Sequence, residues 1–413
     1  MVATQTVALH KLGSSGIDGA DLIIGIFLLI LLINKMNKHN TVSFTLLDIL
    51  GILLLSGVVI GASNGGVGAL LRGIIIVLKV LTLTFLIGNF VYKKETIVFF
   101  IKWFIIITSM SAVIGIFQEI IFISSGVVVA GMVDEDTLKL MFEPTSFGMF
   151  LRVPAFTGFY KNLTYLLIPC IIIVFNLIIY NFRQLSFTTK ALLLLSLFLT
   201  GSALLLTFSK DSYLAVFIAI LFSFIVRWPY RIIHVSMDFL VLLLIIYYAG
   251  LFDDIYNACY AELHWQEYRM RLQLFREGVY GFIYCHPWVG IGYNQSPFYT
   301  ADVLFWPPHN AFLNAACEMG LIGLIPYLLL IGYTLFSAWS LSLVVTELKD
   351  KAITIGLLIG IIGNLISMQF HGTYITPYLW QLMGVVQAYR LVVSKGKDKN
   401  IVSDSKEKRG SGL

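Results

Sequence analysis

Apolar runs long enough to cross a membrane recur along almost the whole chain. A bilayer-spanning helix needs about 20 mainly apolar residues. Such runs lie near residues 20–33, 42–61, 70–91, 97–124, 163–180, 191–208, 213–226, 232–251, 312–339, 352–370 and 378–393. Only 12% of the 413 residues are charged, about half the usual share of about 25%, so the chain cannot cover a water-facing surface. We predict an all-α polytopic membrane protein with about eleven transmembrane helices (between about ten and twelve) and exclude soluble, fibrous and disordered classes.

Basic residues in alternate connections set the expected orientation. They are Lys35, Lys38, Lys93, Lys94, Arg183, Lys190, Arg227, Arg231, Lys349, Lys351 and the cations of the tail. Because basic residues collect on the cytoplasmic side of membrane proteins, we expect these connections and the C-terminus in the cytoplasm and the N-terminus outside. Residues 1–19 are polar, so we expect no cleavable signal peptide.

The same pattern divides the chain into five parts. We expect a polar N-terminal segment (1–19), eight transmembrane helices with an outside loop near 126–162 (20–251), a large extracytoplasmic loop (252–310), three further transmembrane helices (311–394) and a disordered cytoplasmic tail (395–413). Functional residues of such scaffolds usually lie in their long loops, so the large loop is the first place to search.

The large loop contains an amphipathic pattern. Its apolar positions recur at spacings of three and four, namely Trp265, Tyr268, Leu272, Phe275 and Val279. This spacing predicts a helix at the membrane interface. Arg269 and Arg276 share one of its faces, while Arg271 projects from another. Gly290 and Gly292 follow and permit a tight turn.

His309 stands directly before a predicted membrane helix. Pro307 and Pro308 exclude helix before it, and Asn310 is a good N-cap for the helix that follows. The positive end of the helix dipole disfavours imidazolium, so we expect His309 to be neutral and able to accept a proton. The same helix end attracts phosphate.

Four short motifs occur in a fixed order around this histidine. They are Arg271-Leu272-Gln273-Leu274-Phe275, Pro287-Trp288-Val289-Gly290-Ile291-Gly292, His309-Asn310-Ala311-Phe312-Leu313 and Glu318-Met319-Gly320-Leu321-Ile322-Gly323. With Gly115-Ile116-Phe117-Gln118 and the segment 152–162 as looser matches, the chain from residue 115 onwards resembles the superfamily of O-antigen ligases and Wzy-type polysaccharide polymerases.

This resemblance implies a membrane glycosyltransferase of GT-C architecture whose donor is an undecaprenyl-diphosphate-linked glycan. It implies a catalytic histidine and two arginines, with no metal and no cofactor. His309 and Arg271 match the histidine and the loop arginine, whereas the second arginine position is Lys210. Lysine keeps the charge but lacks the bidentate fork of arginine. The implied partners are a glycan acceptor, the membrane, a flippase and a chain-length regulator; no basic stretch with interleaved aromatics points to nucleic acid.

Residue chemistry supports the same roles. Cationic side chains compensate the charge of a departing lipid diphosphate, which suits Arg271 with Lys210. A neutral histidine suits the removal of a proton from the acceptor hydroxyl, and direct displacement inverts the anomeric centre. Further substrate-binding candidates are Arg152, Lys161, Arg269, Arg276 and Asn310. The alternatives are a packing role for His309 and membrane-boundary roles for the cations.

Three functions fit these sequence features. The favoured one is a polymerase that joins lipid-linked repeat units of O-antigen, capsule or exopolysaccharide on the outer face of the bacterial cytoplasmic membrane. The compact outside loop and the His-Asn-x-x-Leu form favour it over a ligase that transfers the glycan to lipid A–core. A transporter or flippase is the alternative of another class, because Arg72, Lys79 and Glu119 lie within predicted spans.

Overall fold

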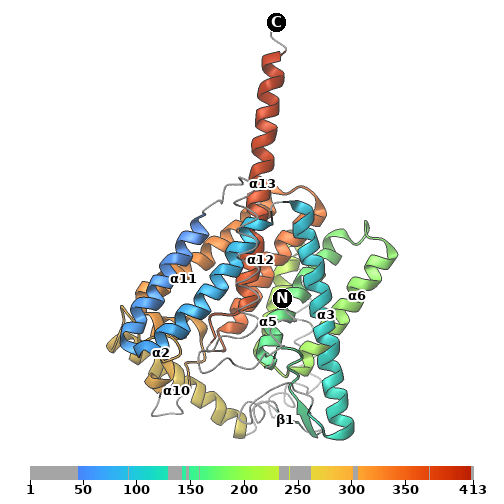
Figure 1. The fold of residues 1–413 in the computed structure, drawn as a ribbon. Coiled ribbons are helices and arrows are strands. Elements are labelled where there is room, and N and C mark those ends of the chain that lie inside the picture. Colours follow the sequence, from blue (N-terminus) through green and yellow to red (C-terminus); the bar gives the residue numbers. More distant parts are fainter. Residues whose placement is uncertain are drawn as a thin grey trace.

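The fold is taken from a computed structural model and is a bundle of long helices (Figure 1). The structure describes residues 45–91, 93–128, 142–145, 148–157, 159–231, 241, 262–300, 306–371 and 373–410. The α-helices are α2 (Leu46–Phe90), α3 (Lys94–Ser125), α5 (Tyr160–Asn181), α6 (Phe187–Leu206), α7 (Lys210–Arg227), α10 (Glu262–Tyr284), α11 (Ala311–Val344), α12 (Leu348–Met368) and α13 (Pro377–Gly410). Two short 3₁₀ helices, η3 (Pro229–Arg231) and η4 (Ser296–Thr300), and an antiparallel hairpin of β1 (Phe142–Thr145) and β2 (Gly148–Leu151) complete the described elements.

The prediction of a polytopic, nearly all-helical membrane protein is confirmed. Among the described residues, 6 helices are long and apolar enough to cross a membrane. They are Asn64–Asn89, Lys94–Ser125, Tyr160–Asn181, Phe187–Leu206, Ala311–Val344 and Leu348–Met368, and a shorter apolar helix covers Leu46–Ala62. The predicted run at 20–33 lies outside the described residues, as does almost all of the run at 232–251. The total of about eleven spans stays a prediction.

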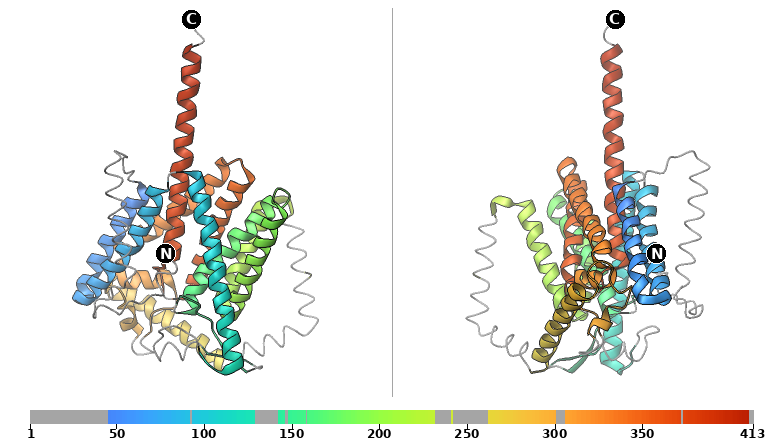
Figure 2. Two further views of the ribbon diagram at one scale, coloured as in Figure 1. Left: turned by 45° about the vertical axis from the view of Figure 1, so that its right-hand side comes forward. Right: turned by 90° about the vertical axis from the view of Figure 1, so that its left-hand side faces the viewer.

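Two of the long helices are interrupted at a glycine. In α2 the chain reverses near Gly66 (φ 77°), and its two limbs lie side by side (Figure 2). In α11 the interruption is at Gly320 (φ 60°, ψ −168°), so the segment 311–319 departs from the axis of the rest of the helix. Residues with a side chain rarely adopt these backbone angles, whereas glycine does so at little cost.

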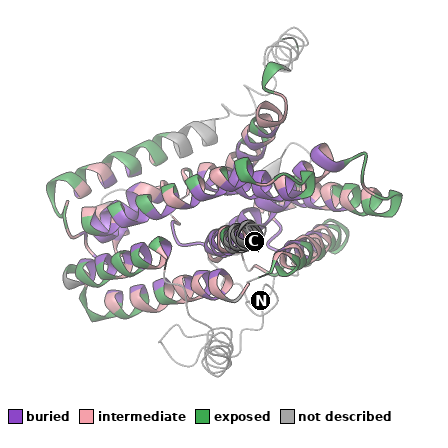
Figure 3. Ribbon diagram, turned by 90° about the horizontal axis from the view of Figure 1, so that it is seen from above, coloured by how far each residue is buried: buried purple, intermediate pink, exposed green. Residues whose placement is uncertain are grey.

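The centre of the bundle is formed by α5 and α12. Most of their side chains are buried, whereas α3 and α6 have fewer buried side chains and present exposed ones on the outer faces (Figure 3). The Asn364 side chain of α12 donates a hydrogen bond of 3.0 Å to the Tyr165 carbonyl of α5. In a membrane such outer faces contact lipid, so this pattern is expected of helices at the rim of a membrane bundle.

The predicted cytoplasmic connections and the large loop lie at opposite ends of the bundle. The connections that contain Lys93, Arg183 and Lys349 lie at the end from which α13 projects (Figure 1). The β1–β2 hairpin, α10 and the start of α11 lie at the opposite end (Figure 2). The basic connections that we predict to be cytoplasmic are thus separated from the large loop by the thickness of the bundle.

Two details differ from the sequence predictions. The hairpin was not predicted within the all-α fold; the Glu119 carboxylate of α3 accepts a hydrogen bond of 3.1 Å from the backbone N–H of Leu151 and fixes β2 on the bundle. The polar tail, predicted to be disordered, continues α13 as a helix to Gly410. Extending an existing helix needs no new nucleation, which explains how a polar segment remains helical.

Candidate functional site

The start of α11 presents His309 at the end of the bundle that holds the large loop. Asn310 caps this helix as predicted, because its side-chain oxygen accepts a hydrogen bond of 2.9 Å from the backbone N–H of Leu313. His309 is half-buried, and both of its ring nitrogens are shielded from solvent. The Trp306 ring contacts the His309 ring edge-to-face at a centroid distance of 6.0 Å. The histidine therefore has a defined position beside a helix N-terminus.

The loop after α10 fills the interruption in α11. Backbone N–H groups of Leu321 and Ile322 donate to the carbonyls of Pro287 (2.9 Å) and Trp288 (3.2 Å). In return, Gly292 donates to the carbonyl of Glu318 at 2.9 Å. The predicted tight turn is confirmed, with φ of 74° at Gly290 and 97° at Gly292. The Pro-x-x-Gly-x-Gly and Glu-x-Gly-x-x-Gly motifs thus form one interlocked backbone unit, which sets the direction of the segment that begins beside His309.

Glu318 strengthens this unit from inside. Its side chain is buried and accepts hydrogen bonds from the hydroxyls of Ser296 (3.0 Å) and Tyr374 (2.8 Å). These bonds connect α11 with η4 and with the segment between α12 and α13. Since a buried carboxylate needs such partners, Glu318 serves to hold three segments together.

The segment between α12 and α13 brings a second histidine to the site. The Asn310 side chain donates to the side-chain oxygen of Gln369 at 3.1 Å. Two residues further on, the His371 ring lies 6.0 Å from that of His309 and 6.2 Å from that of Phe159. Burial and the nearby charge of Lys161 lower the pKa of His371 to about 3. His371 was not among the predicted site residues, although it directly follows a predicted span on the same side as the large loop.

A buried ion pair joins α5, α7 and α12 beside these histidines. The Lys161 ammonium contacts the Asp211 carboxylate and donates to the Ser209 hydroxyl at 2.7 Å. Asp211 also accepts a hydrogen bond of 2.8 Å from Ser367 of α12. Lys161, one of the predicted substrate-binding residues, is therefore buried and has an internal counter-ion.

Arg152 is likewise paired within the protein. It forms an ion pair with Glu143 of β1, and it donates to the Tyr160 hydroxyl at 2.8 Å. Its guanidinium also lies 5.0 Å from the centre of the Tyr160 ring. These contacts fix the segment after the hairpin on the first turn of α5, next to Lys161.

Arg271 of α10 lies near the cluster formed by Arg152, Lys161, His309 and His371. This exposed arginine is close enough for its charge to act on Tyr160, Lys161 and His371. The predicted helix of the large loop is present as α10. Leu274 and Gly278 are among its buried positions. The Cys317 thiol of α11 donates a hydrogen bond of 3.3 Å to the Gly278 carbonyl. Helix packing therefore places Arg271 near residues that lie about a hundred positions away in the sequence.

The other predicted cations lie on the periphery. Arg269 and Arg276 are exposed on α10, and Lys210 is exposed at the first residue of α7. Arg271, by contrast, is close enough for its charge to act on both Lys161 and His371. The structure thus gathers Arg152, Lys161, Arg271, His309 and Asn310, and it adds His371, Asp211 and Tyr160.

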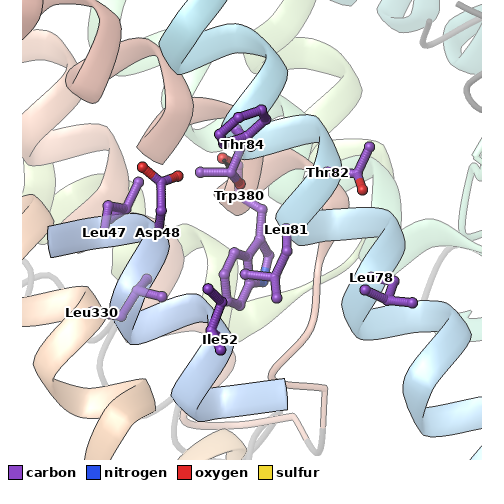
Figure 4. A pocket seen from close by; sticks show the side chains of 10 residues that line it. Leu47, Asp48, Ile52, Leu78, Leu81, Thr82, Thr84, Leu330 and Trp380 are labelled. Atoms are coloured by element: carbon purple, nitrogen blue, oxygen red, sulfur yellow. Dashed lines mark hydrogen bonds between the residues drawn. The ribbon is translucent and has the colours of Figure 1, made fainter. Parts of the chain in front are cut away.

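The apolar pocket between α2 and α13 and a metal site are less well supported as functional sites. The pocket of Figure 4 lies between the limbs of α2 and α13, and its walls are mostly apolar. Asp48, its one carboxylate, accepts hydrogen bonds from Thr45 in a capping box (2.8 Å from the backbone N–H), so this carboxylate already has a structural role. Among the described residues no three His, Cys, Asp or Glu side chains converge as a metal site requires.

A comparison with protein families connects this geometry to a known class. The family model described as O-antigen ligase matches residues 191–328. Residues 191–328 are thus similar to the O-antigen ligase family, and we call them the O-antigen ligase domain. The O-antigen ligase domain covers most of α6, all of α7 and α10 and the first part of α11, and it contains Lys210, Arg271 and His309. The comparisons with curated proteins and with solved structures gave no match. Arg152, Lys161 and His371 lie outside the O-antigen ligase domain and reach its site only through the fold.

Proposed function

We propose that this protein is a GT-C-type membrane glycosyltransferase that extends a cell-surface polysaccharide from undecaprenyl-diphosphate-linked repeat units. The observation that supports this most directly is the meeting of His309 and Arg271 within one cluster. Both belong to the O-antigen ligase domain. Their end of the bundle is opposite to the basic connections, which suits an active site on the outer face of the bacterial cytoplasmic membrane.

The donor's diphosphate is assigned to Arg271. Arg271 is exposed at the edge of the cluster, whereas Lys161 is buried and Arg152 is partly buried. A guanidinium binds phosphate oxygens through two parallel charge-assisted hydrogen bonds. Lys210, Arg269 and Arg276 are exposed at the same end and supply a positive surface along which the diphosphate approaches.

His309 is assigned as the general base. In the proposed step the acceptor hydroxyl attacks the anomeric carbon of the donor and passes its proton to His309. The bond between that carbon and the diphosphate oxygen breaks, and undecaprenyl diphosphate leaves with the bonding electrons. The attack comes from the face opposite to the leaving group, so the anomeric centre is inverted. The residues of this step require no metal or cofactor.

Two acceptors fit this chemistry. The polymerase function is our first choice, on the sequence grounds given above, with a second lipid-linked repeat unit as acceptor and a flippase and a chain-length regulator as partners. The family description favours the ligase function, in which lipid A–core is the acceptor. Both functions use the same donor and the same base, so the site residues have the same roles in each.

The transporter alternative gains little support. Glu119 is buried and bonded to the backbone of Leu151. Arg72 is exposed and bonded to the Gly68 carbonyl of its own helix at 3.1 Å. Glu119 and Arg72, two of the three ionisable residues on which the alternative depends (the third is Lys79), therefore have local structural partners. The ionisable residues of the cluster, by contrast, come from several separate segments.

The test is an assay of the purified full-length protein with undecaprenyl-diphosphate-linked repeat units. A ladder of longer lipid-linked glycans supports the polymerase, and transfer to lipid A–core supports the ligase. The His309→Ala variant should lose activity by about 10²–10⁴-fold, the usual contribution of a general base. His286→Ala is a matched control, because His286 is exposed at the same end of the bundle but outside the cluster. Full activity of His309→Ala, or substrate crossing liposomes without turnover, would refute the proposal.

A further inference from the structure

We propose that His371 is a second histidine of the acceptor site, which binds the attacking sugar hydroxyl together with His309. This inference rests on the proposed function and adds a residue to it. No sequence motif and no part of the O-antigen ligase domain points to His371, which lies beyond residue 328. What points to it is the geometry of the two segments that meet at the cluster.

The two histidines are held opposite each other by the segments that contain them. Asn310 follows His309 and donates to the side chain of Gln369 at 3.1 Å and to its carbonyl at 3.4 Å. The two imidazole rings lie 6.0 Å apart at an interplanar angle of 72°. This is the separation of an edge-to-face ring pair, so the rings are neighbours. In the proposed complex the acceptor hydroxyl lies beside the two rings and contacts both.

His371 is positioned by rigid elements. Its ring contacts the Phe159 ring at 6.2 Å and 70°, directly before α5. Its backbone N–H donates to the Met368 carbonyl at 3.2 Å, at the end of α12. Since α5 and α12 form the centre of the bundle, His371 is held by its most buried helices. Such preorganisation suits a group that orients a reacting hydroxyl.

The surroundings of His371 give it a different role from a base. Burial and the charges of Lys161 and Arg271 keep its imidazole neutral, with the Asp211 carboxylate acting in the opposite direction. A pKa of about 3 makes it a poor proton acceptor at neutral pH. A neutral imidazole still offers one N–H donor and one acceptor nitrogen. It can therefore bind a hydroxyl oxygen without taking the proton.

The roles of the two histidines then complement each other. The N–H of His371 donates to one lone pair of the acceptor oxygen, and the hydroxyl hydrogen points to His309. When the second lone pair attacks the anomeric carbon, the hydroxyl proton moves to His309, while the proton of His371 stays in place. His371 thus selects the orientation in which attack and proton removal coincide.

The experiment separates the acceptor from the donor. Wild type, His371→Phe and His371→Gln are assayed with the undecaprenyl-diphosphate-linked donor and a short-chain acceptor that bears the same sugar but no diphosphate. We expect His371→Phe to lower kcat/KM for the acceptor by about tenfold, the loss that one hydrogen bond corresponds to, with the KM for the donor unchanged. His371→Gln restores an N–H donor and should recover part of this loss. His286→Phe is the matched control and should behave as wild type.

The outcomes distinguish a failure of the role proposed for His371 from a failure of the proposed function. Wild-type acceptor kinetics in His371→Phe, an equal loss for donor and acceptor, or no recovery in His371→Gln would overturn the role of His371 and leave the proposed function intact. A wild-type protein that transfers no glycan to any acceptor would overturn the proposed function together with this inference. If His371→Phe lacks the melting transition of wild type, His371→Met replaces it and the same criteria apply, because methionine adapts to irregular packing.

Discussion

Substitution of Gly320, where α11 is interrupted, should lower both the stability and the activity of the protein. A Cβ atom at this position would lie 2.3 Å from the carbonyl carbon and oxygen of Trp288 and 2.4 Å from the backbone nitrogen of Val289. All three are backbone atoms, so no side-chain rotation relieves the clash. In addition, the backbone angles of Gly320 (φ 60°, ψ −168°) belong to a region that is almost restricted to glycine.

The cost of Gly320→Ala follows from these two effects. The backbone conformation costs about 1–3 kcal/mol for a residue with a side chain. Forcing the 287–292 loop away from α11 costs about another 1–3 kcal/mol, as for other overpacked sites. We therefore expect a clear fall in the melting temperature of the purified protein. Because this loop fixes the segment that begins beside His309, transfer activity should also fall at temperatures where the variant is still folded.

Gly332 provides the matched control within the same helix. No heavy atom lies within 4 Å of a Cβ placed there, and its φ is not positive. Gly332→Ala should be neutral or slightly stabilising, since alanine is favoured over glycine in helices by about 1 kcal/mol. Thermal unfolding in detergent, followed by intrinsic fluorescence, measures both variants. Equal melting temperatures for Gly320→Ala and Gly332→Ala would refute the interlocked unit as described.

Two further predictions concern the ionisable groups of the site. Asp211→Asn should destabilise the protein by about 3–5 kcal/mol because it leaves a buried Lys161 without its counter-ion. The double variant Lys161→Met/Asp211→Asn should be more stable than Asp211→Asn alone. A lower melting temperature for the double variant than for Asp211→Asn would contradict the buried ion pair. For His371, whose pKa in the folded protein is about 3 against about 6.5 in an unfolded chain, the unfolded state binds a proton below about pH 6.5 that the folded state does not bind. The stability of the protein should therefore fall as the pH falls from about 6.5 towards 3. In melting curves recorded across this pH range, the melting temperature of His371→Phe should depend less on pH than that of wild type. An equal pH dependence of the two melting temperatures would contradict the depressed pKa of His371.

Local sequence signals account for much of the fold. The apolar runs within the described residues correspond to helices because hydropathy over about 20 residues is a property of each segment alone. The N-cap at Asn310 and the turn at Gly290 and Gly292 were also predictable, since side-chain capping and positive φ depend on one or two residue types.

The pairing of charges could not be predicted in the same way. Lys161 and Asp211 are 50 residues apart, and their contact depends on how α5 packs against α7. The sequence therefore presents Lys161 as an available cation, whereas the structure gives it a partner. The interruption of α11 is a similar case, because the run at 312–339 is apolar enough for one span. A buried Glu318 two residues before Gly320 was the available signal, since a carboxylate within a span usually has a structural or functional partner.

The interlocked unit and the chemistry depend on each other. If α11 continued straight through Gly320, the segment 311–319 would follow the axis of the rest of the helix, and the Asn310–Gln369 hydrogen bonds would be lost. His309 would then no longer face His371, although every side chain of the site would still be present. The glycines of the two interlocked motifs therefore contribute to the site by fixing the direction of one helix segment. It follows that a backbone change at Gly320, far along the helix from His309, should disturb the proposed acceptor site more than an exposed substitution on α10 that lies nearer to the substrate.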